Sequence, residues 1–154
     1  MSESMSGPHL VAAFLCERVL QERDGVFSFI RMIDRINVAG PLPQMQPVPF
    51  QATVVVLFKA GGLGTGKYML TLQVHKPNGE SLPQTEHPLL FDGGEDRGAG
   101  IVNPFAFMAS EEGLYWIDVS FESALITRIP LRFLYHRIGP MFQIPFGEQT
   151  PPKT

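Results

Sequence analysis

The segment from residue 60 to residue 71 contains the residue types of a phosphate-binding loop. Gly61 and Gly66 are separated by four residues and followed by Lys67, as in loops whose backbone N–H groups hold the phosphates of a nucleotide. That chemistry also needs a Ser or Thr after the lysine to bind magnesium, and a helix whose N-terminus points at the phosphates. Tyr68 occupies the magnesium-binding position, and the residues after it alternate as in a strand. We therefore expect a flexible hairpin loop between two strands, with a solvated Lys67 and no nucleotide site.

The residues that could bind a metal are dispersed along the chain. The histidines lack the short spacing of metal ligands, and the acidic loop at residues 92–96 lacks the dense alternating carboxylates of a calcium loop. A metal or hydrolase site would need at least three candidate side chains within about 5 Å of one point, a reach set by ligand bonds of about 2 Å. The candidates are His75, His87, His136, Asp92, Glu95 and Asp118. This site is the weaker alternative, and we predict no metal, no cofactor and no enzymatic activity.

Cys16 is the only cysteine, which excludes an intramolecular disulfide and a cysteine-based zinc site within one chain. It lies in an apolar stretch without a nucleophile signature, so we expect a buried, unreactive thiol. That stretch, residues 10–16, has no Lys or Arg before it and ends at Glu17 and Arg18. Neither a signal peptide nor a membrane helix fits this pattern. These features favour a cytoplasmic protein with no membrane partner.

The aromatic residues indicate a second kind of site. Trp116 and Tyr68 are the large amphipathic aromatic side chains that predicted strands would present. Together with Lys67 and the loops at residues 61–66 and 92–100, they would line a concave cleft for a small ligand or a carbohydrate. This is the alternative function, and a convex surface at these positions would remove it.

The composition is that of one globular domain. The chain has 154 residues, of which 44% are hydrophobic and 18% charged, and a chain of this length buries enough surface to fold without staples. Its net charge of −3 provides no general basic field, so nucleic acid is not an expected partner.

Frequent glycine and proline turns separate short runs rich in Val, Ile, Phe, Thr and Tyr, which is typical of sandwiches and barrels. Apolar residues alternate in three runs, and Pro130 in the third indicates an edge or a bulge. Residues 52–58 are apolar on both faces, as in a central strand. The core residues predicted from the alternating runs are Tyr68, Leu70, Leu72 and Val74, then Tyr115, Ile117, Val119 and Phe121, then Leu125, Ile129, Leu131, Phe133 and Tyr135.

Two neighbouring segments leave more than one interpretation. Val11 to Arg23 suits a helix or a strand, and we favour a strand that pairs with Val26 to Val38 across an Asp24-Gly25 turn. Val26 to Val38 is apolar on both faces, with Phe27, Phe29 and Ile33 on the odd face. One core face cannot use all of this surface. Either a bulge switches the faces or the second face meets another subunit.

Residues 111–115, Glu-Glu-Gly-Leu-Tyr, resemble the tyrosine-corner signature Asp-x-Gly-x-Tyr of Greek-key sandwiches, in which a tyrosine hydroxyl ties a loop to the start of a strand. The motifs F-L-C-E-R-V-L at 14–20, S-F-I-R-M-I-D-R-I at 28–36, P-F-Q-A-T-V-V-V at 49–56 and P-L-R-F-L-Y at 130–135, with the Asp24-Gly25 turn and Gly113-x-Tyr115, accompany it. With these motifs the chain resembles a family of small bacterial proteins of unknown function over about residues 9–136. The resemblance implies an all-β sandwich and a strand at Val11 to Arg23, and it implies no catalytic residues.

We therefore predict an all-β fold, a single antiparallel β-sandwich of about seven to nine strands with Greek-key-like connections. A mobile tail at residues 1–8 precedes a domain at 9–138, and a proline-rich extended arm at 139–154 follows it. The function that we expect is a non-enzymatic interaction or structural module that forms a homo-oligomer or binds an unidentified protein partner. The predicted contact residues are Phe27, Phe29, Ile33, Met141, Phe142, Ile144 and Phe146.

Overall fold

The computed structural model describes residues 7–139, which form nine strands and no helix. The all-β class is therefore confirmed, and within this described range no helix is long and apolar enough to cross a membrane. Residues 1–6 and 140–154, which include most of the predicted tail and arm, lie outside the described residues. The strands are β1 (His9–Gln21), β2 (Phe27–Ile33), β3 (Arg35–Gly40), β4 (Val48–Lys59), β5 (Gly66–His75), β6 (Thr85–Phe91), β7 (Gly98–Ala109), β8 (Gly113–Phe121) and β9 (Ala124–Arg137).

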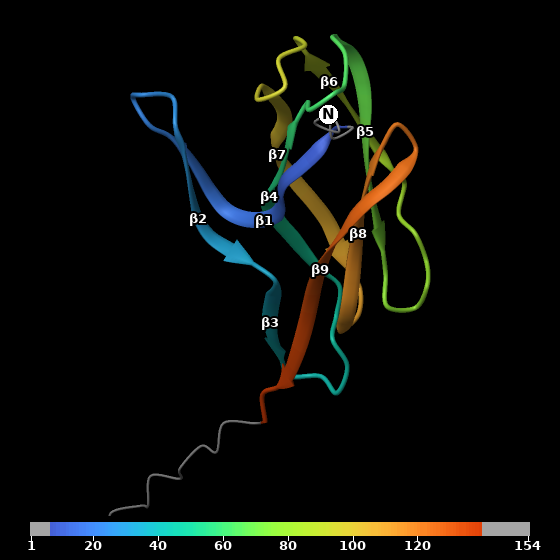
Figure 1. The fold of residues 1–154 in the computed structure, drawn as a ribbon. Helices are drawn as coiled ribbons and strands as arrows, with labels where there is room; N and C mark the ends of the chain where they lie inside the picture. Colours follow the sequence, from blue (N-terminus) through green and yellow to red (C-terminus); the bar gives the residue numbers. More distant parts are fainter. Residues whose placement is uncertain (1–6, 140–154) are drawn as a thin grey trace, which may run out of the picture.

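The strands form two curled sheets, one in the order β2-β1-β4-β7 and the other in the order β3-β9-β8-β5-β6 (Figure 1). The prediction of a purely antiparallel fold is wrong, because β3 runs parallel to β9. The physical reason is the connection between β2 and β3. Asp34 alone separates the two strands, so the chain passes from the first sheet into the second without reversing its direction.

Side chains from both sheets pack into one hydrophobic core. The predicted alternation in β5 and β8 is confirmed, since Leu70, Leu72, Ile117 and Val119 are almost fully buried. A central position for residues 52–58 is confirmed as well, because β4 lies between β1 and β7. In β9 the predicted core residues Ile129, Leu131 and Phe133 are all buried.

Leu125 is an error in the predicted core, because its side chain is 56% exposed. The pairing of β8 with β9 shifts register between Val119 and Ser120, so that Val119 lies opposite Thr127 and Ser120 opposite Leu125. The extra residue in β9 turns the side chains before it to the other face of the sheet. Sequence alternation alone cannot show such a bulge.

The tyrosine corner is confirmed. Tyr115 is fully buried at the start of β8. Its hydroxyl donates a hydrogen bond of 2.8 Å to the carbonyl of Glu111 and accepts one of 3.2 Å from the Glu111 N–H. The buried ring therefore anchors the loop that connects β7 and β8.

The glycine-rich segment at residues 61–66 connects β4 with β5, and β5 begins at Gly66. A strand therefore follows the glycines where a phosphate loop needs a helix, as the sequence predicts. The expected hairpin is wrong, however, because β4 and β5 belong to different sheets. At Gly61, which has a φ of 57°, a Cβ atom would lie 2.8 Å from His9 Nε2. The glycine lets this connection cross closely over the start of β1.

Candidate interaction site at the β1–β2 hairpin

β1 and β2 form a hairpin that extends beyond the body of the first sheet (Figure 1). The strand reading of Val11 to Arg23 is thus confirmed, and so is the turn at Asp24-Gly25, where Gly25 has a φ of 85°. Pairing of β1 with β4 ends at Cys16, whereas pairing with β2 continues to Gln21. The outer part of β1 therefore has β2 as its only partner strand among the described residues.

The predicted continuous strand at Val26 to Val38 is wrong, since it divides at Asp34 into β2 and β3. Part of the excess apolar surface is buried as a result, because Ile33, Ile36 and Val38 pack against the core. The other apolar side chains of this segment are on β2. That strand lies at the edge of its sheet, where it hydrogen-bonds to β1 on one side.

Exposed apolar side chains concentrate on this hairpin. Of the thirteen large hydrophobic residues that are exposed in the described part of the chain, seven lie between residues 11 and 32. They are Val11 (56%), Leu20 (42%), Val26 (59%), Phe27 (43%), Phe29 (37%), Ile30 (38%) and Met32 (72%). An exposed apolar patch of this kind marks an interaction surface more often than a scattered single residue does.

The hairpin curves over the outer face of the first sheet. Val11 is an extra residue in β1, because Leu10 lies opposite Phe58 and Ala12 opposite Leu57, and a bulge bends and twists the strand that carries it. The ring of Phe14 meets the ring of Phe29 edge to face at 5.0 Å, and Phe29 stacks on Phe27 at 6.4 Å. These three residues form a hairpin aromatic cluster outside the main core.

Cys16 in β1 and Val55 in β4 are fully buried, although neither belongs to the main core. Their core-facing neighbours in the alternating strands are Leu15 and Val54, so Cys16 and Val55 belong to the outer face of the sheet. Burial raises the pKa of the Cys16 thiol, and this effect exceeds the opposite effect of a backbone hydrogen bond from Arg18. Both observations agree with the expectation of an unreactive thiol.

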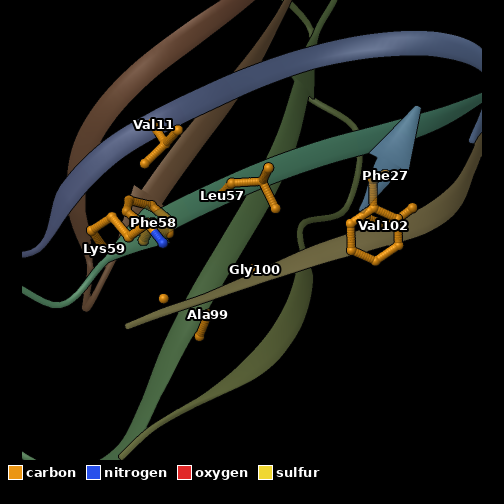
Figure 2. Close-up of a pocket in the computed structure, with 9 residues that line it drawn as sticks. Val11, Phe27, Leu57, Phe58, Lys59, Ala99, Gly100 and Val102 are labelled. Carbon is orange, nitrogen blue, oxygen red and sulfur yellow. The ribbon is translucent and has the colours of Figure 1, made fainter. Parts of the chain in front are cut away.

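A groove of about 580 Å³ lies between the hairpin and the outer face of β4 and β7. Figure 2 shows Phe27 and Val102 at one end of the groove and Val11 and Lys59 at the other end. Leu57 lies between the two ends. The lining is mainly aliphatic and aromatic, with the Lys59 amine at the rim. It suits an apolar side chain or segment better than a polar substrate.

Glycines keep the floor of the groove open. A Cβ atom at Gly98 would lie 2.2 Å from the carbonyl oxygen of Phe58, and one at Gly100 would lie 2.3 Å from that of Val56. Either contact is too close for a side chain, so β7 can approach β4 here only as glycine. The same absence of side chains leaves space above the strands.

Some charged groups on the hairpin have a partner on the neighbouring strand. Arg31 makes an ion pair of 3.0 Å with Glu17 on the neighbouring strand, and Ser28 donates a hydrogen bond of 2.9 Å to Glu22. Arg31 has a φ of 54°, a conformation uncommon for a residue with a side chain.

The predicted contact residues are only partly brought together. Phe27 and Phe29 lie in the hairpin aromatic cluster, whereas Ile33 packs against the main core. The predicted contact residues of the arm, Met141, Phe142, Ile144 and Phe146, lie outside the described residues. The sequence interpretation missed Val11, Leu57 and Val102. A signal was present in the alternation of Gly98, Gly100 and Val102, which places two glycines and a valine on one face of a strand.

The residues of the alternative ligand site do not meet. Trp116 alternates with the buried Tyr115 and Ile117, so its side chain lies on the outer face of the second sheet. Tyr68 faces the opposite way, where its ring contacts Phe91 and Phe121. Lys67 is exposed next to it. Since Trp116 and Tyr68 occupy opposite faces of one sheet, they cannot line a common cleft.

The dispersed metal site is not assembled among residues 7–139, where no three His, Cys, Asp or Glu side chains converge. His75 does contact Asp118, with Nε2 and Oδ2 at 2.9 Å. His87 instead contacts Thr85 at 3.0 Å and Asn103 at 3.3 Å, and its burial lowers the pKa of the imidazole. Asp92 pairs with Arg97 at 2.6 Å, and this hydrogen bond holds the pKa of the carboxyl below its usual value.

Comparison with known proteins gives a family without an assigned role. The model of a family of unknown function, DUF6941, matches residues 11–134. No curated protein matches the chain.

Proposed function

The chain belongs to this family of unknown function, and we propose from the geometry of the β1–β2 hairpin that it is a self-associating interaction module. The observation that carries the proposal is the concentration of exposed apolar side chains on an edge strand, next to an apolar groove. The scaffold that we propose for the module is the Greek-key-like β-sandwich predicted from the sequence.

The proposed partner is a second copy of the chain. Among the strands that the structure describes, β2 is an edge strand, and its outer N–H and C=O groups are available for pairing with another strand. If β2 pairs with β2 of a second copy about a two-fold axis, each hairpin brings the same patch to the other, as closed dimers require. The two four-stranded sheets would then become one continuous sheet.

Apolar burial supports the same arrangement. Transfer of a large apolar side chain from water into an interface contributes roughly 1.5–3 kcal/mol when burial is complete. Met32 and Val26 are 72% and 59% exposed in the single chain, so most of their surface is available to a partner. We infer that the contact surface acts by binding, since its lining is mainly apolar.

The test compares two substitutions that remove equally exposed residues. Met32 on β2 is 72% exposed and Leu90 on β6 is 73% exposed. We expect Met32→Glu to weaken self-association at least about tenfold, because one lost apolar contact of about 1.4 kcal/mol has that effect. Leu90→Glu should leave association unchanged. Sedimentation velocity over a concentration series measures both.

A shortened chain that ends at Gly139 tests whether the hairpin associates without the arm. The proposal expects this shortened chain to associate as the full chain does. A full-length protein that stays monomeric at the highest attainable concentration would refute the proposal. So would equal effects of Met32→Glu and Leu90→Glu.

A further inference from the structure

The outer face of the second sheet carries a row of hydrogen-bonded side chains that the hairpin does not involve. The Oγ of Ser81 lies 2.7 Å from Nδ1 of His75, and Nε2 of His75 lies 2.9 Å from Oδ2 of Asp118. The other carboxylate oxygen of Asp118 accepts a hydrogen bond of 2.6 Å from Nε of Arg128. The row thus contains a hydroxyl, an imidazole and a carboxylate in series.

The backbone explains how these residues meet. His75 is the last residue of β5, and the turn that follows brings Ser81 back opposite it as an isolated bridge. In the pairing of β5 with β8, Gln73 lies opposite Asp118 and His75 opposite Trp116, so His75 and Asp118 are diagonal neighbours on the same face. Ser81 follows His75 by six residues, and the turn between them brings the hydroxyl to the imidazole.

The hydrogen-bonding capacity of each group determines the proton positions. An ionised carboxylate only accepts hydrogen bonds, so the proton shared with Asp118 belongs to Nε2 of His75. Nδ1 then has a lone pair and accepts the hydrogen bond of the Ser81 hydroxyl. This is the arrangement in which a histidine acts as a base toward a serine nucleophile.

We propose that Ser81 is a nucleophile, activated by His75 and positioned through Asp118, that takes acyl groups from small aryl esters. Ser81 is exposed, so an electrophile can reach its Oγ. Trp116 lies beside His75 on the same face, with the Arg128 guanidinium over its ring, so we place the aryl group at the edge of this ring. Activated esters suit the site because their aryloxide leaves without protonation by an acid.

In the first step, the Oγ of Ser81 bonds to the carbonyl carbon while the bond from that carbon to the aryl oxygen breaks. The hydroxyl proton goes to Nδ1 of His75 and from there to solvent, so that an acyl-serine and an aryloxide result. In the second step, water adds to the acyl carbon, gives a proton to His75, and releases the carboxylic acid. Ser81 recovers its proton from His75 as the acyl bond breaks.

Arg128 completes the support of Asp118. Its guanidinium lies 5.0 Å from the centre of the Trp116 ring and bonds to the carboxylate oxygen that does not face His75. Asp118 is therefore held from both sides, with a side chain only 22% exposed. It is a positioning residue, because it acts on Ser81 through His75.

The test uses the full-length chain and a biotinylated fluorophosphonate. In this reaction the Oγ of Ser81 bonds to phosphorus, fluoride leaves, and the hydroxyl proton passes through His75 to water. Intact mass and peptide mapping should locate one adduct on the peptide that contains Ser81. Ser123 is an internal control, because it is also exposed on a turn of the same sheet. Its peptide should stay unmodified.

The variants distinguish two roles for the hydrogen-bonded row: activation of Ser81, or stabilisation of the turn alone. Ser81→Ala should abolish the adduct. His75→Gln keeps a side-chain hydrogen bond to Ser81 and removes the base, so labelling should slow by about 10²-fold, the usual contribution of general base catalysis. Ser123→Ala, which removes an exposed hydroxyl on a turn of the same sheet, should have no effect on labelling.

Asp118→Asn presents an N–H to His75 and favours the tautomer whose proton lies on Nδ1, so Ser81 loses its base. With an aryl ester as substrate, this variant should lower the maximal rate and leave the half-saturating concentration unchanged, while the thermal midpoint stays close to that of the wild type. The proposal is overturned if Ser81 is labelled no faster than Ser123. It is also overturned if His75→Gln leaves the labelling rate unchanged.

Discussion

Replacement of Tyr115 by phenylalanine removes one oxygen atom from the best-defined polar contact of the core. The hydroxyl donates to the Glu111 carbonyl at 2.8 Å and accepts from the Glu111 N–H at 3.2 Å. The ring itself is fully buried and packs edge to face on Phe133 at 5.1 Å. Phenylalanine keeps this packing, so the change isolates the tyrosine corner.

The magnitude follows from the two hydrogen bonds. Each contributes about 0.5–1.5 kcal/mol net, and a group left buried without a partner costs about 1–3 kcal/mol. We expect the free energy of unfolding to fall by about 2 kcal/mol, which at a urea slope of about 2 kcal/mol/M lowers the midpoint by about 1 M. The slope should not change, because the native fold is retained.

Urea unfolding followed by circular dichroism measures this change. Tyr68→Phe is the matched control, since the Tyr68 hydroxyl donates to the Gly64 carbonyl at 3.0 Å in an exposed position where water can replace it. We expect the control to lose less than about 0.5 kcal/mol. A Tyr115→Phe loss no larger than that of the control would refute the role assigned to the corner.

Three further predictions concern burial. Leu72→Ala in the core should lower the free energy of unfolding by about 2–5 kcal/mol in urea titrations, whereas Leu90→Ala, at a site that is 73% exposed, should change it little. Cys16 should react with a thiol reagent only after unfolding, because it is fully buried and burial raises the pKa of its thiol; rapid modification of the native protein would contradict this. Burial lowers the pKa of His87 in the folded state, so the unfolded chain binds more protons than the folded chain. Stability should therefore fall as the pH drops below about 6.5. In His87→Gln the urea midpoint should depend less on pH over that range.

Much of the fold could be predicted because alternation is a local property. Leu70 and Leu72 in β5, and Ile117 and Val119 in β8, repeat every second residue in the sequence and are buried in the structure. A strand side chain reaches the core or the solvent according to this period alone, as long as no residue is inserted. The tyrosine corner was predictable for a similar reason, since its hydrogen bond spans only four residues.

Two of the errors lie where a single residue changes the pairing. An extra residue in β9 turned Leu125 outward, and Asp34 redirected the chain from one sheet to the other. Neither residue has a distinctive local pattern. The strand partners on each side decide whether a bulge or a crossing forms.

The sequence by itself determined that the chain is all-β, that its apolar surface exceeds one core, and that Asp24-Gly25 turns a hairpin. Tertiary structure alone decided where the excess surface lies and which polar groups meet. The groove exists because a bulge at Val11 curves β1 over the outer face of β4 and β7. The row from Ser81 to Asp118 exists because β5 and β8 pair in one register, which joins His75 to Asp118, 43 positions later in the chain. Contacts of this kind depend on the register between distant strands, and the alternation within one strand carries no information about it.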